Sequence, residues 1–122
     1  MIVKNVMPTV ITEYVVETAK EFEKIGFKQK HHLVEENKIE LIVMDTEGGS
    51  RVEFMTPPAP GVKHACGNTV IVDNIDEAID FFSTNGFKKI TDVITAQHTK
   101  VCIMLWEATG TMTSVMQHVK EE

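Results

Sequence analysis

The sequence predicts an α+β fold built from two tandem β-α-β-β-β modules, and the main evidence is an internal repeat. "PTVI" at 8–11 returns as "NTVI" at 68–71, and "IGFK" at 25–28 returns as "NGFK" at 85–88, each 60 residues later. In both copies a β-branched run precedes an amphipathic stretch, and three more strand-like runs follow it. A duplicated module accounts for all three observations.

The first module begins with a strand predicted at 2–12, which is rich in β-branched residues. A helix follows, because Val15, Ala19 and Phe22 repeat at helical spacing, and Gly26 is placed to end it. Strands are then predicted at about 27–35, 38–45 and 51–56, with turns at "ENK" and "TEGGS" between them.

The second module follows the same plan. "GNTVIVD" at 67–73 is typical of a strand, and Asn74 with Glu77 has the spacing of a helix cap. Gly86 is placed to end this helix as Gly26 ends the first. The apolar stripe of the helix consists of Ile75, Ala78, Ile79 and Phe82. The strands that follow are predicted at about 87–96, 100–106 and 111–119.

A proline-rich connector sets the module boundaries. "TPPAPGVK" at 56–63 would interrupt any sheet, so module one is assigned to 1–56, the linker to 57–63 and module two to 64–122, within a single domain. A ferredoxin-like arrangement is the nearest alternative. It places only two strands between its helices, whereas the gap from Gly26 to Ile75 fits four.

Composition limits the class of protein. The chain has 122 residues, 43% hydrophobic and 25% charged, as in ordinary globular domains. The net charge of −6 disfavours a nucleic-acid partner, because phosphate binding needs clustered Lys and Arg. No apolar run approaches the roughly 20 residues that span a bilayer, so we expect no membrane partner and a cytoplasmic location. Cys66 and Cys102 form no CxxC pair and are expected to be reduced thiols.

Two short motifs end the predicted helices, "FEKIGF" at 22–27 and "FSTNGF" at 82–87. Two βαβββ modules with this signature resemble the vicinal oxygen chelate superfamily, and the resemblance covers essentially the whole chain. That superfamily includes glyoxalase I, methylmalonyl-CoA epimerase, extradiol dioxygenases, fosfomycin-resistance enzymes and metal-free bleomycin-binding proteins. The resemblance implies a curved, partly open mixed β-barrel, with the helices on its outer face and a ligand chamber on its concave side.

The resemblance also indicates where metal-dependent members take their ligands, on the first and last strands of each module. These positions fall at or beside Met7, Glu53, Gly67 and Ser114. Only Glu53 is a donor that a divalent ion prefers. A shifted set of Glu53, His64 and His118 stays open as a weak alternative, although His118 lies far along its strand from Ser114. We therefore expect no metal or other cofactor.

Strand alternation predicts which side chains line the chamber. Aliphatic residues at matching positions are predicted under the helices: Ile39, Leu41, Val43, Val101, Ile103 and Leu105. The opposite parity gives the candidate ligand-binding residues Met7, Thr9, Met44, Glu53, Met55, Thr69, Met104, Trp106, Ser114 and Met116, with Glu40, Ile42 and Cys102 on the same face. Methionines adapt to varied apolar ligands, and Trp106 offers a flat stacking surface. A packed core, or a face covered by a partner subunit, explains the same composition.

Three functions follow from these observations. The leading hypothesis is a small-molecule-binding protein that resembles the metal-independent bleomycin-resistance branch and binds a small, partly apolar molecule. The first alternative is a metal-dependent glyoxalase- or dioxygenase-type enzyme with Glu53 as a ligand. The second is a ligand-free structural or regulatory homodimer. Members of the superfamily commonly pair, so a homodimer is expected from the resemblance, and no catalytic residue is assigned.

Overall fold

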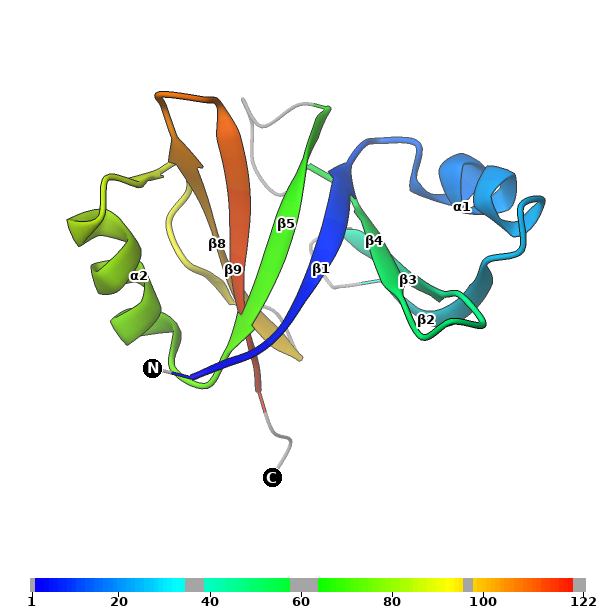
Figure 1. The fold of residues 1–122 in the computed structure, drawn as a ribbon, viewed down its shortest axis with the longest axis horizontal. Coiled ribbons are helices and arrows are strands. Elements are labelled where there is room, and N and C mark those ends of the chain that lie inside the picture. Colours follow the sequence, from blue (N-terminus) through cyan, green and yellow to red (C-terminus); the bar gives the residue numbers. More distant parts are fainter. Residues whose placement is uncertain (1, 35–38, 58–63, 96–97, 120–122) are drawn as a thin grey trace. The chain divides into compact units, whose positions relative to one another are not determined.

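The computed structural model describes residues 2–34, 39–57, 64–95 and 98–119 (Figure 1). Residues Met7–Cys66 form one compact unit, which we call the N-terminal unit. Met1–Val6 and Gly67–Glu122 form the second, C-terminal unit. Apart from Pro57, the predicted linker lies outside the described residues. Each unit has one helix that packs against one face of a sheet.

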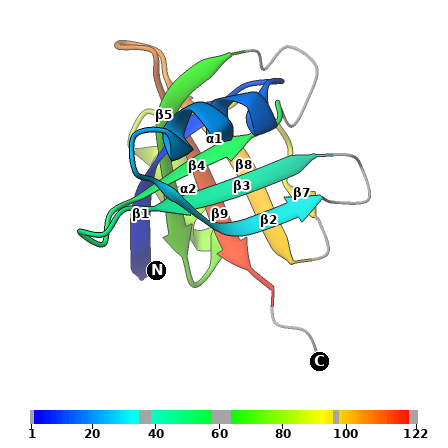
Figure 2. The ribbon, with the colours of Figure 1, turned by 90° about the vertical axis from the view of Figure 1, so that its right-hand side faces the viewer.

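The N-terminal unit contains β1 (Val3–Ile11, from Met7 onward), α1 (Val15–Glu23), β2 (Lys28–Val34), β3 (Glu40–Asp45) and β4 (Arg51–Met55). The strand order is β2-β3-β4-β1, with β1 parallel to β4 and the other neighbours antiparallel. In Figure 2, α1 lies over β4 and β3. The helix buries Val15 and Ala19, and the ring of Phe22 contacts that of Phe54 at 4.9 Å.

Gly26 ends α1 as the sequence predicts. Its φ of 101° lies in the left-handed region, which a residue without a β-carbon adopts at little cost. The Gly26 N–H donates to the carbonyl of Glu23, and the Phe27 N–H donates to that of Phe22. These bonds satisfy carbonyls at the helix end and direct the chain into β2.

The C-terminal unit contains β5 (Ala65–Val72, from Gly67 onward), α2 (Ile75–Thr84), β6 (Lys88–Lys89), β7 (Ile94–Thr95), β8 (Thr99–Trp106) and β9 (Thr111–His118). The strand order is β5-β9-β8-β6, β7 also pairs with β8, and β5 is parallel to β9. The two modules therefore repeat one topology. The predicted α+β class with two βαβββ modules is confirmed.

The N-terminus of α2 is capped as predicted. The Asn74 side-chain oxygen accepts the Glu77 N–H at 3.1 Å, and the side-chain oxygen of Gln117 accepts the Ile75 N–H at 2.9 Å. Two of the N–H groups that a helix start leaves without backbone partners are thereby satisfied. Neither α1 nor α2, the helices of the described ranges, is long and apolar enough to cross a membrane.

The structure differs from the prediction at 87–96, where two short strands replace a single one. Lys89 pairs with Met104 and Ile94 pairs with Val101, so five steps along this border segment match three steps along β8. The hydroxyl of Thr91 accepts the Ile103 N–H at 3.1 Å, a backbone donor that a continuous ladder would have used. A side chain therefore replaces part of the ladder, and the strand is interrupted.

Candidate functional site

The helix-covered face of each sheet is defined by the side chains that pack against the helix. In the N-terminal unit, Ile42, Met44, Val52 and Phe54 pack with Val15 and Ala19 of α1. In the C-terminal unit, Cys102, Met104, Val115 and Val72 pack with Ile75, Ala78 and Ile79 of α2. The prediction that Met44 and Met104 lie on the opposite, chamber face is therefore wrong, as it is for Ile42 and Cys102.

The error in β3 and β8 has a physical origin. Both faces of these central strands are buried: Leu41 and Ile42 in β3, and Ile103 and Met104 in β8, are nearly inaccessible to solvent. The alternation of side chains shows which face of a strand is buried when the other face is polar. When both faces are apolar, it does not show which of them packs against the helix. Burial also raises the pKa of the Cys102 thiol, which donates a weak hydrogen bond to the Thr91 carbonyl.

Trp106 also lies away from its predicted position. The centroid of its ring lies 6.2 Å from that of Phe87, and Phe87 packs against the buried residues of α2. Trp106 is 44% exposed. It shares the parity of Cys102 and Met104 along β8, at the end of the strand. The prediction of Trp106 as a stacking surface inside a chamber is therefore wrong.

The face of the N-terminal sheet turned away from α1 carries a buried polar pair. Phe54 packs toward the helix, so alternation places Glu53 and Met55 on the other face. Thr9 is the register partner of Glu53, and its hydroxyl donates to a Glu53 carboxylate oxygen at 3.3 Å. Glu53 is only 2% exposed. Met7 and Met55 are buried as well.

The predicted placement of Met7, Thr9, Glu53 and Met55 on one face therefore agrees with the register of β1 and β4. Their neighbours differ from the prediction. Val43 pairs with Glu53 and Leu41 pairs with Met55, so these two aliphatic residues share the face turned away from α1. We call this group of six residues the Glu53 face.

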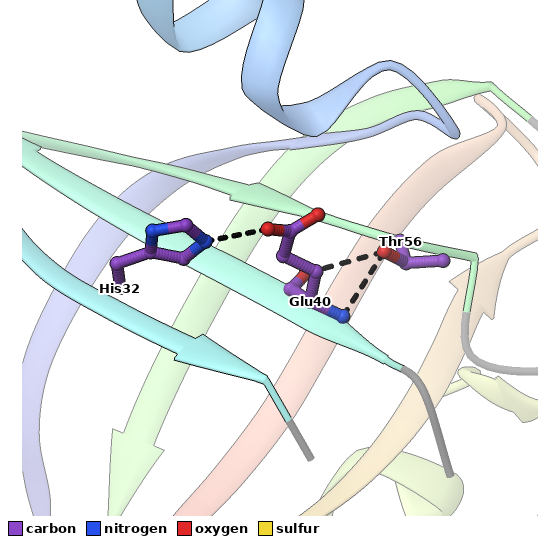
Figure 3. A network of polar contacts seen from close by, with 3 residues as sticks. All are labelled: His32, Glu40 and Thr56. Atoms are coloured by element: carbon purple, nitrogen blue, oxygen red, sulfur yellow. Dashed lines mark hydrogen bonds and ion pairs between the residues drawn. The ribbon is translucent and has the colours of Figure 1, made fainter.

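Glu40, also predicted on the chamber face, instead belongs to a network at the start of β3 (Figure 3). Its carboxylate pairs with the imidazole Nε2 of His32 on β2. The Thr56 hydroxyl accepts the Glu40 N–H at 3.1 Å and lies 3.3 Å from the Glu40 carbonyl. The network ties β3 to β2 on one side and to the end of β4 on the other, which makes it a structural feature of the sheet.

The C-terminal unit has an equivalent face. Ser114 is the register partner of Thr69 on β5 and of Ile103 on β8, and Val101 pairs with Met116. Val115 packs toward α2, so these residues point the other way. Thr69 and Ser114 are fully buried. The predicted placement of Thr69, Ser114 and Met116 on one face agrees with this register, and we call their face the Ser114 face.

The two faces have matching registers with different chemistry. Thr9 lies beside Glu53 in one unit, and Thr69 lies beside Ser114 in the other. The carboxylate of the first unit is thus replaced by a hydroxyl in the second. Among the described residues, the Ser114 hydroxyl is a buried side-chain oxygen without a hydrogen-bond partner.

Position 67 cannot carry a side chain in this backbone. A β-carbon built on Gly67 would lie 2.1 Å from the carbonyl oxygen of Met112 and 3.0 Å from the methyl carbon of its side chain. The backbone oxygen cannot move aside without shifting β9 from β5, since Gly67 and Met112 are register partners. The space beside Gly67 is filled by Met112.

The four positions that the resemblance assigns to metal ligands do not fit a divalent ion. Met7 offers a thioether, Ser114 a neutral hydroxyl and Gly67 nothing, which leaves the carboxylate of Glu53. Within the described ranges, no three His, Cys, Asp or Glu side chains gather in a way that could hold an ion. The weak alternative set of Glu53, His64 and His118 draws on both units, and it stays a prediction.

His64 has other contacts. Its ring stacks on that of Tyr14 with centroids 5.8 Å apart, and its Nε2 lies 3.9 Å from a carboxylate oxygen of Glu13. A hydrogen bond with Glu13 raises the pKa of the exposed Tyr14 phenol. His118 occupies the last position of β9, where it pairs with Thr99.

Solved structures with the same arrangement identify the fold. A structure titled as NAD-dependent benzaldehyde dehydrogenase from Legionella pneumophila matches 94% of this chain and 100% of its own, with a TM-score of 0.69 and 6% identity. Methylmalonyl-CoA epimerase from Mycobacterium tuberculosis matches 97% of this chain and 90% of its own, with a TM-score of 0.66 and 10% identity. The Streptomyces coelicolor epimerase, in complex with 2-nitronate-propionyl-CoA, matches 98% and 100% at the same TM-score and identity.

This chain has the vicinal oxygen chelate fold. The resemblance drawn from "FEKIGF" and "FSTNGF" is thereby confirmed at the level of the fold, because methylmalonyl-CoA epimerases belong to that superfamily. No family model and no curated protein matches the sequence. Identities this low establish the vicinal oxygen chelate fold and leave the activity to be argued from the site.

Proposed function

We propose that this chain is a small-molecule-binding protein of the vicinal oxygen chelate fold that works without a metal, as the bleomycin-resistance branch does. The observation that supports it most is the burial of polar side chains among methionines on the sheet faces turned away from the helices. Thr9 and Glu53 lie beside Met7 and Met55, which are also buried. Burying polar groups costs free energy, so their retention suggests a use beyond packing.

The absence of a suitable donor set favours the metal-independent branch over the enzyme alternative. Closure of position 67 by Met112 removes one ligand position outright, and Ser114 is a poor donor for Zn, Fe or Ni. In this proposal, methionines provide an adaptable apolar surface, and the hydroxyls with Glu53 provide a few polar anchors. The ligand is small and partly apolar.

Metal analysis tests the choice between binding protein and metalloenzyme. The tag-free protein is incubated in turn with Fe(II), Ni(II), Zn(II) and Mn(II), desalted exhaustively and analysed for bound metal. We expect no near-stoichiometric retention in the wild type. Retention of one ion that is lost in Glu53→Gln would overturn the proposal in favour of the enzyme.

A ligand screen tests the binding proposal itself. Ligand-observed NMR with a library of neutral and charged small molecules should find compounds that bind the wild type. Their affinity should fall in Thr9→Val, which removes the hydroxyl beside Glu53. Native mass spectrometry on the same sample gives the oligomeric state. A stable dimer that binds no library compound would support the structural homodimer instead.

A further inference from the structure

The Ser114 hydroxyl is an unused hydrogen-bonding group in the interior. Its oxygen is buried, and it has no partner among the described residues. Native proteins satisfy most buried polar side-chain atoms, so such an exception indicates a missing partner. The closest positions across the sheet are Thr69 on β5 and Ile103 on β8.

The neighbours of this hydroxyl are uncharged, and apart from Thr69 they are apolar. Met112 and Met116 flank Ser114 on the same face of β9, and Ile103 lies beside it on β8. All three are buried, as is Thr69. A ligand ion would lose its hydration here and find no opposite charge on these neighbours, which disfavours a carboxylate or an ammonium group.

Met112 is the adaptable element of this face. The end of its side chain lies over Gly67, where the hypothetical β-carbon would come within 3.0 Å of the methyl carbon. Methionine has three rotatable side-chain bonds and fills irregular spaces in several rotamers. Its terminal methyl can therefore move to admit an apolar group next to Ser114 while the backbones of β5 and β9 keep their register.

We infer that the Ser114 hydroxyl donates a hydrogen bond to the carbonyl oxygen of a neutral, largely apolar ligand. A single hydroxyl donor matches a carbonyl, because the carbonyl brings an acceptor and no donor of its own. An alcohol would add a second O–H group that needs another acceptor among neighbours that, apart from Thr69, are apolar. The inference rests on the proposed function, since it names the ligand class for the Ser114 face.

Three probes of similar size test the inference: acetophenone, ethylbenzene and benzoate. They present a ketone, no polar group and a charged carboxylate on the same ring. Dissociation constants are measured by chemical-shift titration for the wild type, for Ser114→Ala and for Ser83→Ala. Ser83 is an exposed serine on α2 and serves as the matched control.

Acetophenone should bind the wild type about fivefold more tightly than ethylbenzene, the effect of one net hydrogen bond, and benzoate should bind most weakly. This preference should disappear in Ser114→Ala and persist in Ser83→Ala. Circular dichroism melts confirm that both variants are folded. An unchanged preference in Ser114→Ala, or tightest binding of benzoate, would refute the inference.

The controls separate this inference from the broader proposal. Equal binding of acetophenone and ethylbenzene by the wild type would support the proposed binding function and refute the role of Ser114. This result is expected if the Ser114 hydroxyl bonds only to water. If none of the three probes binds while library compounds do, the ligand class is wrong and the proposed function stands. If no compound of either set binds, both fail.

Discussion

Gly67 and Met112 approach so closely that no other residue fits at position 67, where a β-carbon would lie 2.1 Å from the Met112 carbonyl oxygen. Any side chain there would force β5 and β9 apart. The position that the resemblance assigns to a metal ligand is thus closed by the backbone of the neighbouring strand, and substituting a histidine at 67 would not create a ligand in this structure.

Gly67→Ala should lower the free energy of unfolding by about 2 kcal/mol or more, because the added methyl group meets backbone that cannot rotate away. Gly48→Ala is the matched control, since its β-carbon would have only an ordinary contact, 3.8 Å from the Thr46 hydroxyl. Urea denaturation of both variants measures the difference. A Gly67→Ala protein as stable as Gly48→Ala would contradict the close approach of the two strands.

Ser114→Ala should leave the ligand-free protein as stable as the wild type or more stable by about 1 kcal/mol, because it removes a buried hydroxyl without a partner. Thr91→Val provides the contrast, since the Thr91 hydroxyl accepts the Ile103 N–H and its loss leaves that donor unsatisfied. We expect Thr91→Val to lose about 1–3 kcal/mol in the same denaturation experiment. Equal losses in the two variants would show that Ser114 is bonded in solution.

Trp106→Ala should cost about 1 kcal/mol, the scale of an aromatic pair, and leave ligand affinity unchanged. The ring contacts Phe87 on the helix side of β8 and is 44% exposed. Since Trp106 is the one tryptophan of the chain, acrylamide quenching of its fluorescence reports this exposure directly. A strongly protected, blue-shifted emission, or a large loss of ligand affinity in the variant, would show that Trp106 lies inside a ligand chamber, as the sequence predicted.

Asp73→Asn should destabilise the protein at neutral pH and much less in acid. The Ile2 N–H donates to the Asp73 carboxylate at 2.7 Å and holds its pKa below the ordinary 3.8. Since the folded pKa is the lower one, the stabilisation is present above the unfolded pKa. It is lost as pH falls through the folded pKa.

Denaturant titrations of the wild type and Asp73→Asn between neutral pH and pH about 2 test this expectation. The gap between the two free energies of unfolding should narrow at the acidic end. Asp80→Asn on α2 removes the same formal charge and controls for the change in net charge. A gap that stays constant across the range would show that the bond to Ile2 contributes no pH dependence.

Most helices and strands could be predicted from the sequence, because the local signals for them are strong in each module. Gly26 and Gly86 both have positive φ at the helix ends, and Asn74 caps α2 through the Glu77 N–H, as predicted. The β6–β7 interruption was missed because it depends on the Thr91 hydroxyl meeting the Ile103 N–H, a contact between residues 12 apart with no local signature.

The faces were predicted only where polar residues marked them. Thr9 and Glu53 mark one face of the N-terminal sheet, and Thr69 and Ser114 mark the equivalent face of the C-terminal sheet, so their strands could be oriented. In the middle of β3 and β8, apolar residues occupy both faces, from Leu41 to Met44 and from Val101 to Leu105. The sequence does not decide between the two faces there without the register to β4 and β9. Val43 pairs with Glu53, and Ile103 pairs with Ser114. Knowing these two pairs would have placed the correct residues of β3 and β8 on the face turned away from the helix.

The interruption between β6 and β7 has a consequence for self-association. A long, regular border strand presents unpaired backbone groups that can template pairing with another copy and start aggregation. Here the border of the C-terminal sheet is divided into two-residue strands that are out of step by two positions along β8. Short and offset segments are poor templates for strand pairing. The hydrogen bond from the Ile103 N–H to the Thr91 hydroxyl therefore also disfavours fibril-like association at this edge.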